Sequence, residues 1–408
     1  MPKRIAIDLR PLQIGHENRG IGMVIKSVLN TLRDTKNTYV FYMFDSSNPL
    51  EDMNIDVLID HYQIVRTPTL NTSIKSPSDA IDAFKLSMHS FPELRNLNVD
   101  VFIQFDPSLG IPRGNGIKTI CVAYDLIPLI FRHEYLPTAS DILRQSMSKK
   151  AKLKGLVRAF YYNARYRRFC EVYRDCTAIV SISEATKRSF LELLRVPESQ
   201  VHTLPLAPVA NYADAVELTA SESTLGKPYL FYIGGTDSRK HVEDLIYTFN
   251  VIRSRGHDIA LLLAGNELRT VKTIPSVKAR EAIMTSPYRD DIHLRGFVTD
   301  QEKYSLYHGA LAFLFTSAYE GFGLPLVEAA ASRCPVVSYH NSAIPESIGD
   351  AALLVETRNY VAAAKAVISL FDEDLRAAMI EKGVVKTQEY SWAKFSAGLM
   401  RLVDQSTR

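Results

Sequence analysis

The sequence predicts an α/β protein with two domains and a cleft between them. Short apolar runs that resemble buried parallel strands alternate with helical patterns along the chain. Several of these runs end in a glycine-rich loop that leads into a helix, which is the repeating unit of a doubly wound sheet. A chain of 408 residues is too long for one typical core. Two such sheets are therefore expected.

The N-terminal part opens with a predicted strand at residues 4–9. Gly20 and Gly22 follow and open a helical pattern whose apolar residues recur near a 3.6-residue spacing. Residues 45–95 are weakly patterned, and no element is predicted there. These features define an N-terminal, Rossmann-like domain at residues 1–207, whose further strands are expected at residues 39–44, 99–105, 118–124, 177–181 and 201–206.

Few large apolar side chains occur in residues 207–227, which we interpret as a linker. A second Rossmann-like domain is predicted at residues 208–388. The last segment, residues 389–408, is predicted to be a helix that packs back on the N-terminal domain, and it carries the only tryptophan, Trp392. The strands of the second domain are expected at residues 229–233, 259–264, 292–298, 310–315, 335–339 and 352–355.

The loop after the strand at 310–315 is the most informative part of the chain. It begins at Ser317 and reads Ser-Ala-Tyr-Glu-Gly-Phe-Gly-Leu-Pro-Leu-Val-Glu. Gly321 and Gly323 permit a sharp turn, and the proline suits the first turn of a helix. The free N–H groups of that turn and the helix dipole make an anion site. Glu320 and Glu328 flank it and can accept hydrogen bonds from hydroxyls, so the loop indicates a nucleotide sugar, although a glycine pair alone often only shapes a turn.

A second loop, which carries cations, follows the strand at 229–233. It contains Gly234, Gly235, Arg239 and Lys240 and leads into a helix. Arginine holds phosphate oxygens with a planar fork, and lysine adds a point charge. Cations in the first turn of a helix are opposed by its dipole, which favours ligand contact over a solvated surface pair. The two loops are predicted to hold a diphosphate between them.

The charge of the chain is unevenly distributed. The net charge is +3, yet residues 142–170 contain nine Lys or Arg and no Asp or Glu, which leaves −6 for the remainder because 3 minus 9 is −6. A local patch of this kind is not a nucleic-acid-binding composition. Residues 139–175 are predicted to be a long basic helical region, and its apolar residues on one face are Leu153, Leu156, Val157, Phe160 and Ala164. Either this face packs on the domain, or residues 149–168 dock on an anionic membrane surface.

Targeting signals and metal spacings are not evident in the sequence. No apolar run reaches the length of a membrane span, and the N-terminus lacks the apolar core of a signal peptide. We expect a cytoplasmic protein, with peripheral attachment to the inner face of the membrane as an added possibility. The cysteines follow no metal-ligand spacing and are expected to be reduced thiols: Cys121, Cys170, Cys176 and Cys334.

Taken together, these motifs resemble the family 4 retaining glycosyltransferases of the GT-B fold, and they look most like bacterial polysaccharide and lipopolysaccharide mannosyltransferases. The main similarity is the pair Glu320 and Glu328 within Glu-Gly-Phe-Gly-Leu-Pro-Leu-Val-Glu. The resemblance implies two Rossmann-like, doubly wound domains that face each other across a cleft, the first for the acceptor and the second for the nucleotide sugar. Residues 45–95 carry none of it. Further family-like motifs are Arg19-Gly-Ile-Gly22, Ser181-Ile-Ser-Glu-Ala-Thr-Lys187, Gly234 to His241, Arg295-Gly-Phe-Val298, Pro335-Val-Val337 and Gly349 to Val355.

The resemblance also implies roles for individual residues. Arg239 and Lys240 would bind the donor diphosphate and stabilise it as the leaving group. Glu320 would orient the donor sugar, and Glu328 would hold the ribose hydroxyls. Catalysis would be electrostatic and positional, without a cofactor or a metal. The remaining donor contacts would come from Gly20, Gly22, Gly235, Gly296, Val298, Phe322, Gly323 and Leu324.

One pair of residues departs from the family pattern. Family members usually carry His-Asp after the fourth strand of the first domain, where this chain has Tyr124 and Asp125. Asp125 stays a candidate catalytic residue. A tyrosine donates hydrogen bonds but is uncharged near neutral pH. A contact from Tyr124 to a sugar hydroxyl and simple packing of its ring are therefore both open.

The resemblance leads to an expected reaction and two alternatives. The enzyme would move a hexose, with mannose from GDP-mannose as the best match, to a glycan or lipid-linked acceptor in surface polysaccharide synthesis. The match to mannosyltransferases comes from residues 125–129 and 349–354. The alternatives are a nucleotide-sugar epimerase on the same fold, which would need an acid–base pair beside the sugar, and a non-catalytic nucleotide- or glycan-binding protein. No nucleic-acid partner is expected.

Overall fold

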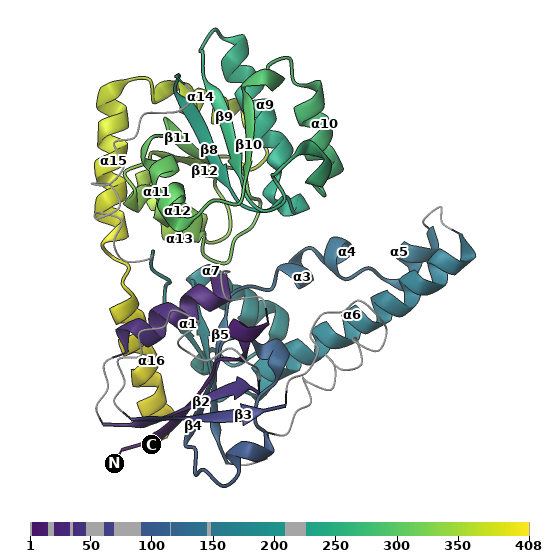
Figure 1. Cartoon of the computed structure of the whole chain (residues 1–408), viewed down its shortest axis with the longest axis vertical. Coiled ribbons are helices and arrows are strands. Elements are labelled where there is room, and N and C mark those ends of the chain that lie inside the picture. The colour runs from purple at the N-terminus through teal and green to yellow at the C-terminus, as the bar shows by residue number, and fades with distance from the viewer. Residues whose placement is uncertain are drawn as a thin grey trace. The chain divides into compact units, whose positions relative to one another are not determined.

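A computed structural model of the protein describes residues 2–14, 20–32, 36–45, 61–68, 91–114, 116–144, 148–208 and 226–407. The chain divides into two compact units (Figure 1). The first comprises Met1–Leu206 together with Trp392–Arg408, and the second comprises Ala207–Ser391. The sequence-based borders, after residues 207 and 388, lie within three residues of these divisions. Every helix in the described part of the chain is too short or too polar to span a bilayer.

The core of the first unit is a parallel sheet with the strand order β3-β2-β1-β4-β5-β6-β7. Six of these strands lie where the sequence predicts strands. The exception is β3, which the sequence analysis missed. It is an edge strand with alternately exposed residues, so it lacks the continuous apolar run of a strand buried on both faces. The strands are β1 (Arg4–Asp8), β2 (Thr38–Phe44), β3 (Tyr62–Thr67), β4 (Val101–Gln104), β5 (Lys118–Ala123), β6 (Ala178–Ser181) and β7 (Val201–Thr203).

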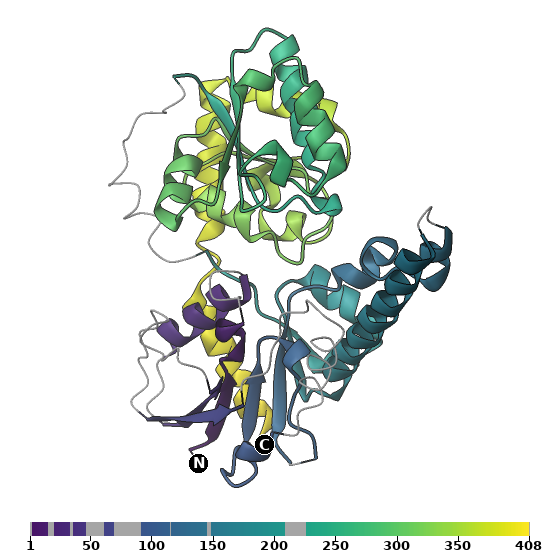
Figure 2. The ribbon, with the colours of Figure 1, turned by 45° about the vertical axis from the view of Figure 1, so that its right-hand side comes forward.

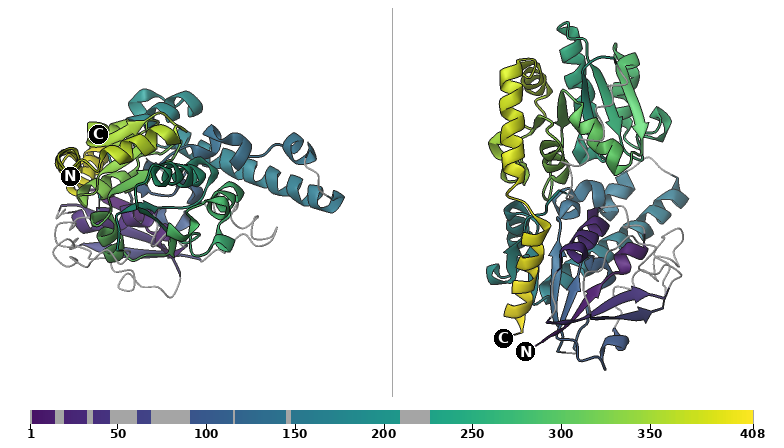
Figure 3. Two further views of the ribbon diagram at one scale, coloured as in Figure 1. Left: turned by 90° about the horizontal axis from the view of Figure 1, so that it is seen from above. Right: turned by 60° about the vertical axis from the view of Figure 1, so that its left-hand side comes forward.

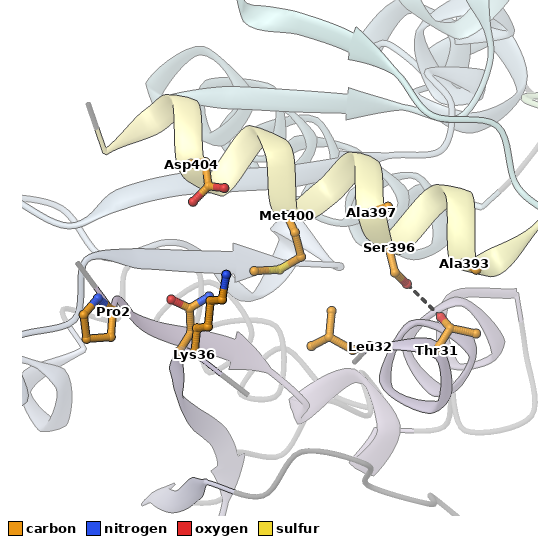
Figure 4. A pocket seen from close by; sticks show the side chains of 10 residues that line it. Pro2, Thr31, Leu32, Lys36, Ala393, Ser396, Ala397, Met400 and Asp404 are labelled. Carbon is orange, nitrogen blue, oxygen red and sulfur yellow. Dashed lines mark hydrogen bonds between the residues drawn. The ribbon is translucent and has the colours of Figure 1, made fainter. Parts of the chain in front are cut away.

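The C-terminal helix α16 (Trp392–Ser406) belongs to the first unit, where it packs against α1 (Gly20–Thr31). The hydroxyl oxygens of Thr31 and Ser396 lie 2.7 Å apart (Figure 4). Lys3, just before β1, forms an ion pair of 2.6 Å with Asp404 near the end of α16. A groove of about 820 Å³ runs beside these contacts between the two ends of the chain. The helix is thus held to the first unit by contacts along its length.

The basic region forms two helices instead of one. The helix α5 (Ala139–Arg144) lies beside the long helix α6 (Lys149–Asp175), and the N-terminal half of α6 extends away from the sheet (Figures 1 and 2). The C-terminal end of α6 is anchored in the core, where the Tyr173 hydroxyl donates to the carbonyl of Val122 at 3.1 Å. The predicted apolar face does not pack on the sheet. Its residues Leu153, Val157 and Phe160 are 65 %, 57 % and 79 % exposed.

The second unit is built on a parallel sheet with the strand order β10-β9-β8-β11-β12-β13. From β8 the chain moves outward through β9 to β10, and it then returns to the other side of β8 with β11. The carboxyl ends of β8 and β11 therefore form the point where the strand order reverses, which is where open α/β sheets bind ligands. The strands are β8 (Tyr229–Ile233), β9 (Ala260–Ala264), β10 (Ile292–Gly296), β11 (Ala312–Phe315), β12 (Val336–Tyr339) and β13 (Ala352–Val355).

Helices cover both faces of this second sheet, as expected for a doubly wound domain (Figure 3). The core between them is almost entirely aliphatic and aromatic. All strand pairs in both sheets are parallel, so the predicted α/β class with two doubly wound sheets is confirmed. The helices are α9 (Val242–Ser254), α10 (Val277–Thr285), α11 (Asp300–His308), α12 (Leu324–Ala331), α13 (Ile344–Ser347), α14 (Tyr360–Ser369) and α15 (Glu373–Thr387).

We predict that Gly398→Val destabilises the first unit. A Cβ atom at Gly398 would lie 2.5 Å from Cδ2 of Leu204, so α16 would have to shift or Leu204 to repack, at a cost of about 1–3 kcal/mol. Trp392 is buried on the same helix, and its fluorescence during urea unfolding reports on this unit. The matched control is Ala397→Val, an exposed position next to it. Equal unfolding midpoints for both variants would show that the close approach is not required.

Candidate active site

The two predicted loops lie side by side at the switch point of the second sheet. β8 and β11 are hydrogen-bonded neighbours, with Leu230 paired to Ala312 and Phe231 to Phe313. The loops that leave their carboxyl ends therefore begin next to each other. The amide of Ala318 in one loop donates to the carbonyl of Arg239 in the other at 2.7 Å. The sheet thus holds the two loops at a fixed spacing.

The glycine loop ends at Gly323, which is the N-cap of α12. Its φ of 89° lies in the left-handed region, and a Cβ atom there would come within 2.9 Å of Leu326. Pro325 occupies the first turn of the helix, as the sequence predicts. The amides of Phe322, Gly323 and Leu324 donate to no acceptor among the described residues. An anion placed before α12 would meet these three N–H groups.

The cationic loop places its two cations differently from the prediction. Arg239 and Lys240 lie in a 3-10 turn, Ser238–Lys240, and not in the first turn of α9. His241 separates them from the helix with a left-handed φ of 44°. The first turn of α9 is acidic instead, as the helix dipole favours. The expected conflict with the dipole is therefore absent, and the turn aims both cations toward the glycine loop.

Arg239, Lys240 and Glu320 form what we call the charged cluster. Oε1 of Glu320 accepts from Nη1 of Arg239 at 2.8 Å and from Nζ of Lys240 at 2.7 Å. Lys240 and Glu320 are only 8 % and 9 % exposed. Because two cations share one carboxylate, the cluster has a net charge of +1. Burial of net positive charge is costly, so these three side chains are suited to have an anion beside them.

The pKa values in the charged cluster follow from burial and charge together. Burial acts to raise the pKa of Glu320, but the charges of Lys240 and Arg239 outweigh it and lower that pKa. Burial lowers the pKa of Lys240, against the attraction of Glu320. Glu320 is thus held as a carboxylate, so it is an acceptor for hydroxyl donors and not a proton donor.

Several residues that the sequence analysis did not single out support the charged cluster. The Thr316 hydroxyl donates to the carbonyl of Lys240 at 2.9 Å, and the Ser342 hydroxyl accepts from the amide of Glu320 at 2.9 Å. The Phe315 ring lies 4.7 Å from Nζ of Lys240, a cation–π contact. Phe315 ends β11, Thr316 directly follows it, and Ser342 lies three residues after the end of β12. That position was the only signal in the sequence that pointed to them.

A second ionic network fixes the start of α9 behind the cationic loop. Arg358 forms ion pairs with Glu243 at 3.0 Å and with Asp244 at 3.2 Å, and it contacts His241. Burial opposes the ionised form of Glu243, yet hydrogen bonds from His241 and Arg358 lower its pKa to about 2. Asp244 also accepts from the Tyr339 hydroxyl at 2.6 Å. The network ties the loop before α14 to the residues that follow Lys240.

The second predicted carboxylate, Glu328, lies in α12 and is paired with a lysine. Nζ of Lys303, in α11, donates to Oε1 of Glu328 at 3.2 Å. Burial acts to lower the pKa of Lys303, but Glu328, Tyr304 and Asp300 together outweigh it, and the pKa rises. The sequence analysis did not identify Lys303. The carboxylate oxygens of Glu328 are suited to accept hydrogen bonds from hydroxyls.

Some backbone groups that were predicted to contact the donor form hydrogen bonds within the protein instead. The carbonyl of Gly235 accepts from the Tyr232 hydroxyl at 2.6 Å. The amide of Gly296 donates to Leu268 at 2.9 Å, and its carbonyl accepts from the amide of Gly265 at 2.7 Å. Val298, two residues further, is partly buried, and Phe297 between them is 62 % exposed. Gly296 therefore shapes the turn at 296–298, and the two residues that follow it are at least partly exposed to solvent.

Three predicted residues belong to the first unit. Gly20 is the first residue of α1, and Gly22 is buried in its first turn. Oδ1 of Asp125 accepts from the amide of Ile127 at 2.9 Å, which orders the turn after β5. Burial raises the pKa of Tyr124, and its hydroxyl has no hydrogen-bond partner within the part of the chain that the structure describes. These residues lie at the start of α1 and at the carboxyl end of β5.

A buried ion pair marks the switch point of the first sheet, between β1 and β4. Nη2 of Arg10 lies 2.6 Å from Oδ2 of Asp8, and both side chains are fully buried. The Gln104 amide also donates to Oδ2 of Asp8, at 2.7 Å. The sequence analysis did not identify this group. Among the described residues, no set of three or more His, Cys, Asp or Glu side chains gathers as metal ligands would.

Known proteins resemble this chain in sequence and in fold. Residues 217–385 match the family described as glycosyl transferases group 1. The chain is 26 % identical over 224 residues to the O-antigen chain mannosyltransferase B of Escherichia coli, covering 52 % of this chain and 57 % of that protein. It is 24 % identical over 249 residues to the serotype-specific mannosyltransferase WbdA of Escherichia coli, covering 59 % of this chain and 28 % of that protein. The chain thus spans little more than half of the first relative and less of the second.

Solved structures resemble the whole chain at low sequence identity. A glycosyltransferase from Rickettsia africae ESF-5 has a TM-score of 0.64 and 16 % identity, over 100 % of this chain and 99 % of its own. Sucrose-phosphate synthase from Thermosynechococcus elongatus has a TM-score of 0.66 and 16 % identity, over 99 % of this chain and 98 % of its own. Anabaena HepE in complex with UDP-glucose has a TM-score of 0.66 and 12 % identity, over 98 % of this chain and 99 % of its own. These likenesses show the GT-B fold, and within the second unit the chain resembles the group 1 glycosyl transferases over residues 217–385.

Proposed function

We propose that the protein is a retaining glycosyltransferase that moves a hexose from a nucleotide diphosphate sugar to a glycan or lipid-linked acceptor. The observation that carries this proposal is the charged cluster beside the N-terminus of α12. Its net charge of +1 and the three amides of Phe322, Gly323 and Leu324 together suit a diphosphate. Glu320 and Glu328 supply acceptors for sugar and ribose hydroxyls. A site of this composition fits a nucleotide sugar better than a free phosphate.

The chemistry follows from where charge develops. As the glycosidic bond to the donor breaks, negative charge grows on the departing diphosphate. Arg239 and Lys240 are already oriented by Glu320, Thr316 and Tyr319, so they stabilise this charge without reorganisation. Attack of the acceptor hydroxyl from the same face, with its proton passing to a donor phosphate oxygen, would retain the anomeric configuration. In this proposal the cations do the work that a metal ion does in other transferases.

Mannose from GDP-mannose is the donor that we propose. Support comes from the relatives described as mannosyltransferases, among them the MMP alpha-(1->4)-mannosyltransferase of Mycolicibacterium hassiacum, 26 % identical over 196 residues, 48 % of this chain and 44 % of that protein. The O-antigen relative also supports surface polysaccharide synthesis as the setting. UDP-glucose, which HepE binds, is the donor against which this proposal is tested.

We expect Lys240→Met to lower kcat for sugar transfer by roughly 10²–10³-fold, because one preorganised cation at the leaving group is lost. The variant should fold normally, since Glu320 keeps its 2.8 Å pair with Arg239 and no buried charge is left alone. Lys278→Met, at an exposed position on α10, is the matched control. Product formation is followed with radiolabelled GDP-mannose and an acceptor lipid extract. Equal rates in the two variants would refute the assignment.

Glu320→Gln should impair both stability and transfer. It removes the carboxylate that Arg239 and Lys240 share, so we expect the free energy of unfolding to fall by about 3–5 kcal/mol, as for a broken buried ion pair. Transfer should be lost even below the unfolding temperature. Thermal unfolding and transfer assays at low temperature separate the two effects. An unchanged melting temperature would contradict the shared-carboxylate arrangement.

A thermal-shift screen of GDP, UDP, ADP and dTDP tests the proposed donor. Ligand at about 100 times its Kd stabilises the native state by roughly 2.7 kcal/mol. We expect the largest rise in melting temperature with GDP and a reduced rise in Lys240→Met. A larger rise with UDP would replace the proposed donor but leave the proposed reaction standing, whereas no rise with any diphosphate would contradict the proposed reaction.

Sugar transfer should persist in excess EDTA. The charged cluster supplies the positive charge at the leaving group, so no divalent ion is required there. Rates are compared with EDTA, with added Mg²⁺ and with added Mn²⁺. Loss of transfer in EDTA that Mg²⁺ restores would overturn the proposal that the reaction is independent of metal ions.

A further inference from the structure

The N-terminal half of α6 presents apolar side chains to solvent. Leu153, Val157 and Phe160 recur at spacings of four and three, so they lie on one side of the helix. All three are among the most exposed large apolar side chains of the described residues. We call Leu153, Val157 and Phe160 the apolar stripe. An exposed contiguous apolar surface of this kind marks an interaction site.

The packing of α5 does not cover the apolar stripe. The contacts between the two helices use a different side of α6, where a Cβ atom on Gly155 would lie 3.1 Å from Ile142. Lys152 donates to the carbonyl of Leu143 at 2.8 Å on that same side. At about 100° per residue, positions 152 and 155 lie well away from positions 153, 157 and 160. The apolar stripe therefore takes no part in the packing of α5 against α6.

Cations border the apolar stripe on both sides. At about 100° per residue, residues 149 and 167 fall on one side of it, and residues 150 and 168 fall on the other. Lys149, Lys150, Lys154 and Arg158 are exposed. Residues 149–170 contain no Asp or Glu, and no described carboxylate forms an ion pair with these four side chains. The surface thus combines apolar contact area with positive charge that is not neutralised nearby.

We propose that this side of α6 binds an anionic phospholipid bilayer, with the apolar stripe inserted among the acyl chains and the flanking cations at the headgroups. A helix with Phe and Leu on one side and Lys or Arg around them lies in a membrane interface in this way. Residues 149–168 span about 30 Å along the helix axis, so the contact is long enough to hold the first unit at the surface. The proposal does not depend on the donor or on the transfer reaction.

Other partners fit the surface less well. A nucleic acid would use the cations but would leave the apolar stripe in water. A second copy of this chain would cover the stripe, but it would bring the bordering cations of two helices together, which costs free energy. An anionic bilayer is complementary to both features at once.

Co-sedimentation with vesicles of phosphatidylcholine and phosphatidylglycerol tests the proposal on the full chain. We expect binding to vesicles with phosphatidylglycerol and much weaker binding to pure phosphatidylcholine. The triple variant Leu153→Ser, Val157→Ser, Phe160→Ser should bind at least roughly tenfold more weakly, since about three apolar side chains leave the bilayer. The matched control is Val277→Ser, Met284→Ser, Val385→Ser, which removes three equally exposed apolar side chains from the second unit. Its binding should equal that of the wild type.

The cations are tested separately. Lys149→Gln with Lys150→Gln should weaken binding roughly tenfold or more at low salt, whereas Lys272→Gln with Lys278→Gln, at exposed positions of the second unit, should not. Insertion is read from Phe160→Trp, whose emission should shift to shorter wavelength with anionic vesicles, while that of Met284→Trp should not. Both readouts keep the test independent of enzymatic activity, and circular dichroism confirms that each variant folds.

Three outcomes would overturn the proposal. The first is that the wild type does not bind anionic vesicles at low salt. The second is that the stripe variant binds as well as the wild type at about 0.5 M salt, where surface charges are largely screened, which would make the contact purely electrostatic. The third is that the protein elutes as a dimer that the stripe variant converts to a monomer, without vesicle binding. That result would assign the stripe to a second copy of the chain.

Discussion

The candidate site depends on one buried carboxylate that is shared by two cations. Glu320 alone can neutralise only one of Arg239 and Lys240, and all three groups are largely removed from water. Such a cluster is tolerable because each cation has a close hydrogen-bonded partner, and the three side chains together carry a net charge of +1. This net charge is the basis on which we propose that the site binds an anion. It is also the reason why we propose a diphosphate, and not a neutral ligand, as the group that binds there.

The surrounding fold supplies the geometry that this charge arrangement needs. The parallel pairing of β8 and β11 places two loops next to each other, and the left-handed Gly323 turns the chain so that α12 begins at the same point. Three amides of that loop and the two cations then converge from different elements. Thr316 and Ser342 hold the backbone of both loops, so the cations are oriented before any ligand arrives.

Much of this arrangement was predictable from sequence, and the features that were missed have physical reasons. Continuous apolar runs reveal strands buried on both faces, whereas the half-exposed edge strand β3 has no such run. The glycine and cation loops were recognisable because few other functions need those residues at strand ends. Lys303 and Arg358 were not, since their carboxylate partners are distant in the chain and only folding joins them. The spacing of apolar residues predicted the apolar face of α6. It could not predict that three of these side chains stay exposed, because spacing does not show which element, if any, packs against a face.

The most direct test of the central claim compares the affinities of a nucleoside diphosphate and its monophosphate for the wild type and for Lys240→Met by isothermal titration calorimetry. If the charged cluster holds the diphosphate, the wild type should bind GDP at least roughly tenfold more tightly than GMP, because a charged hydrogen bond contributes about 1.5–3 kcal/mol. That preference should largely vanish in Lys240→Met. An unchanged ratio of GDP to GMP affinity in the variant would contradict the account.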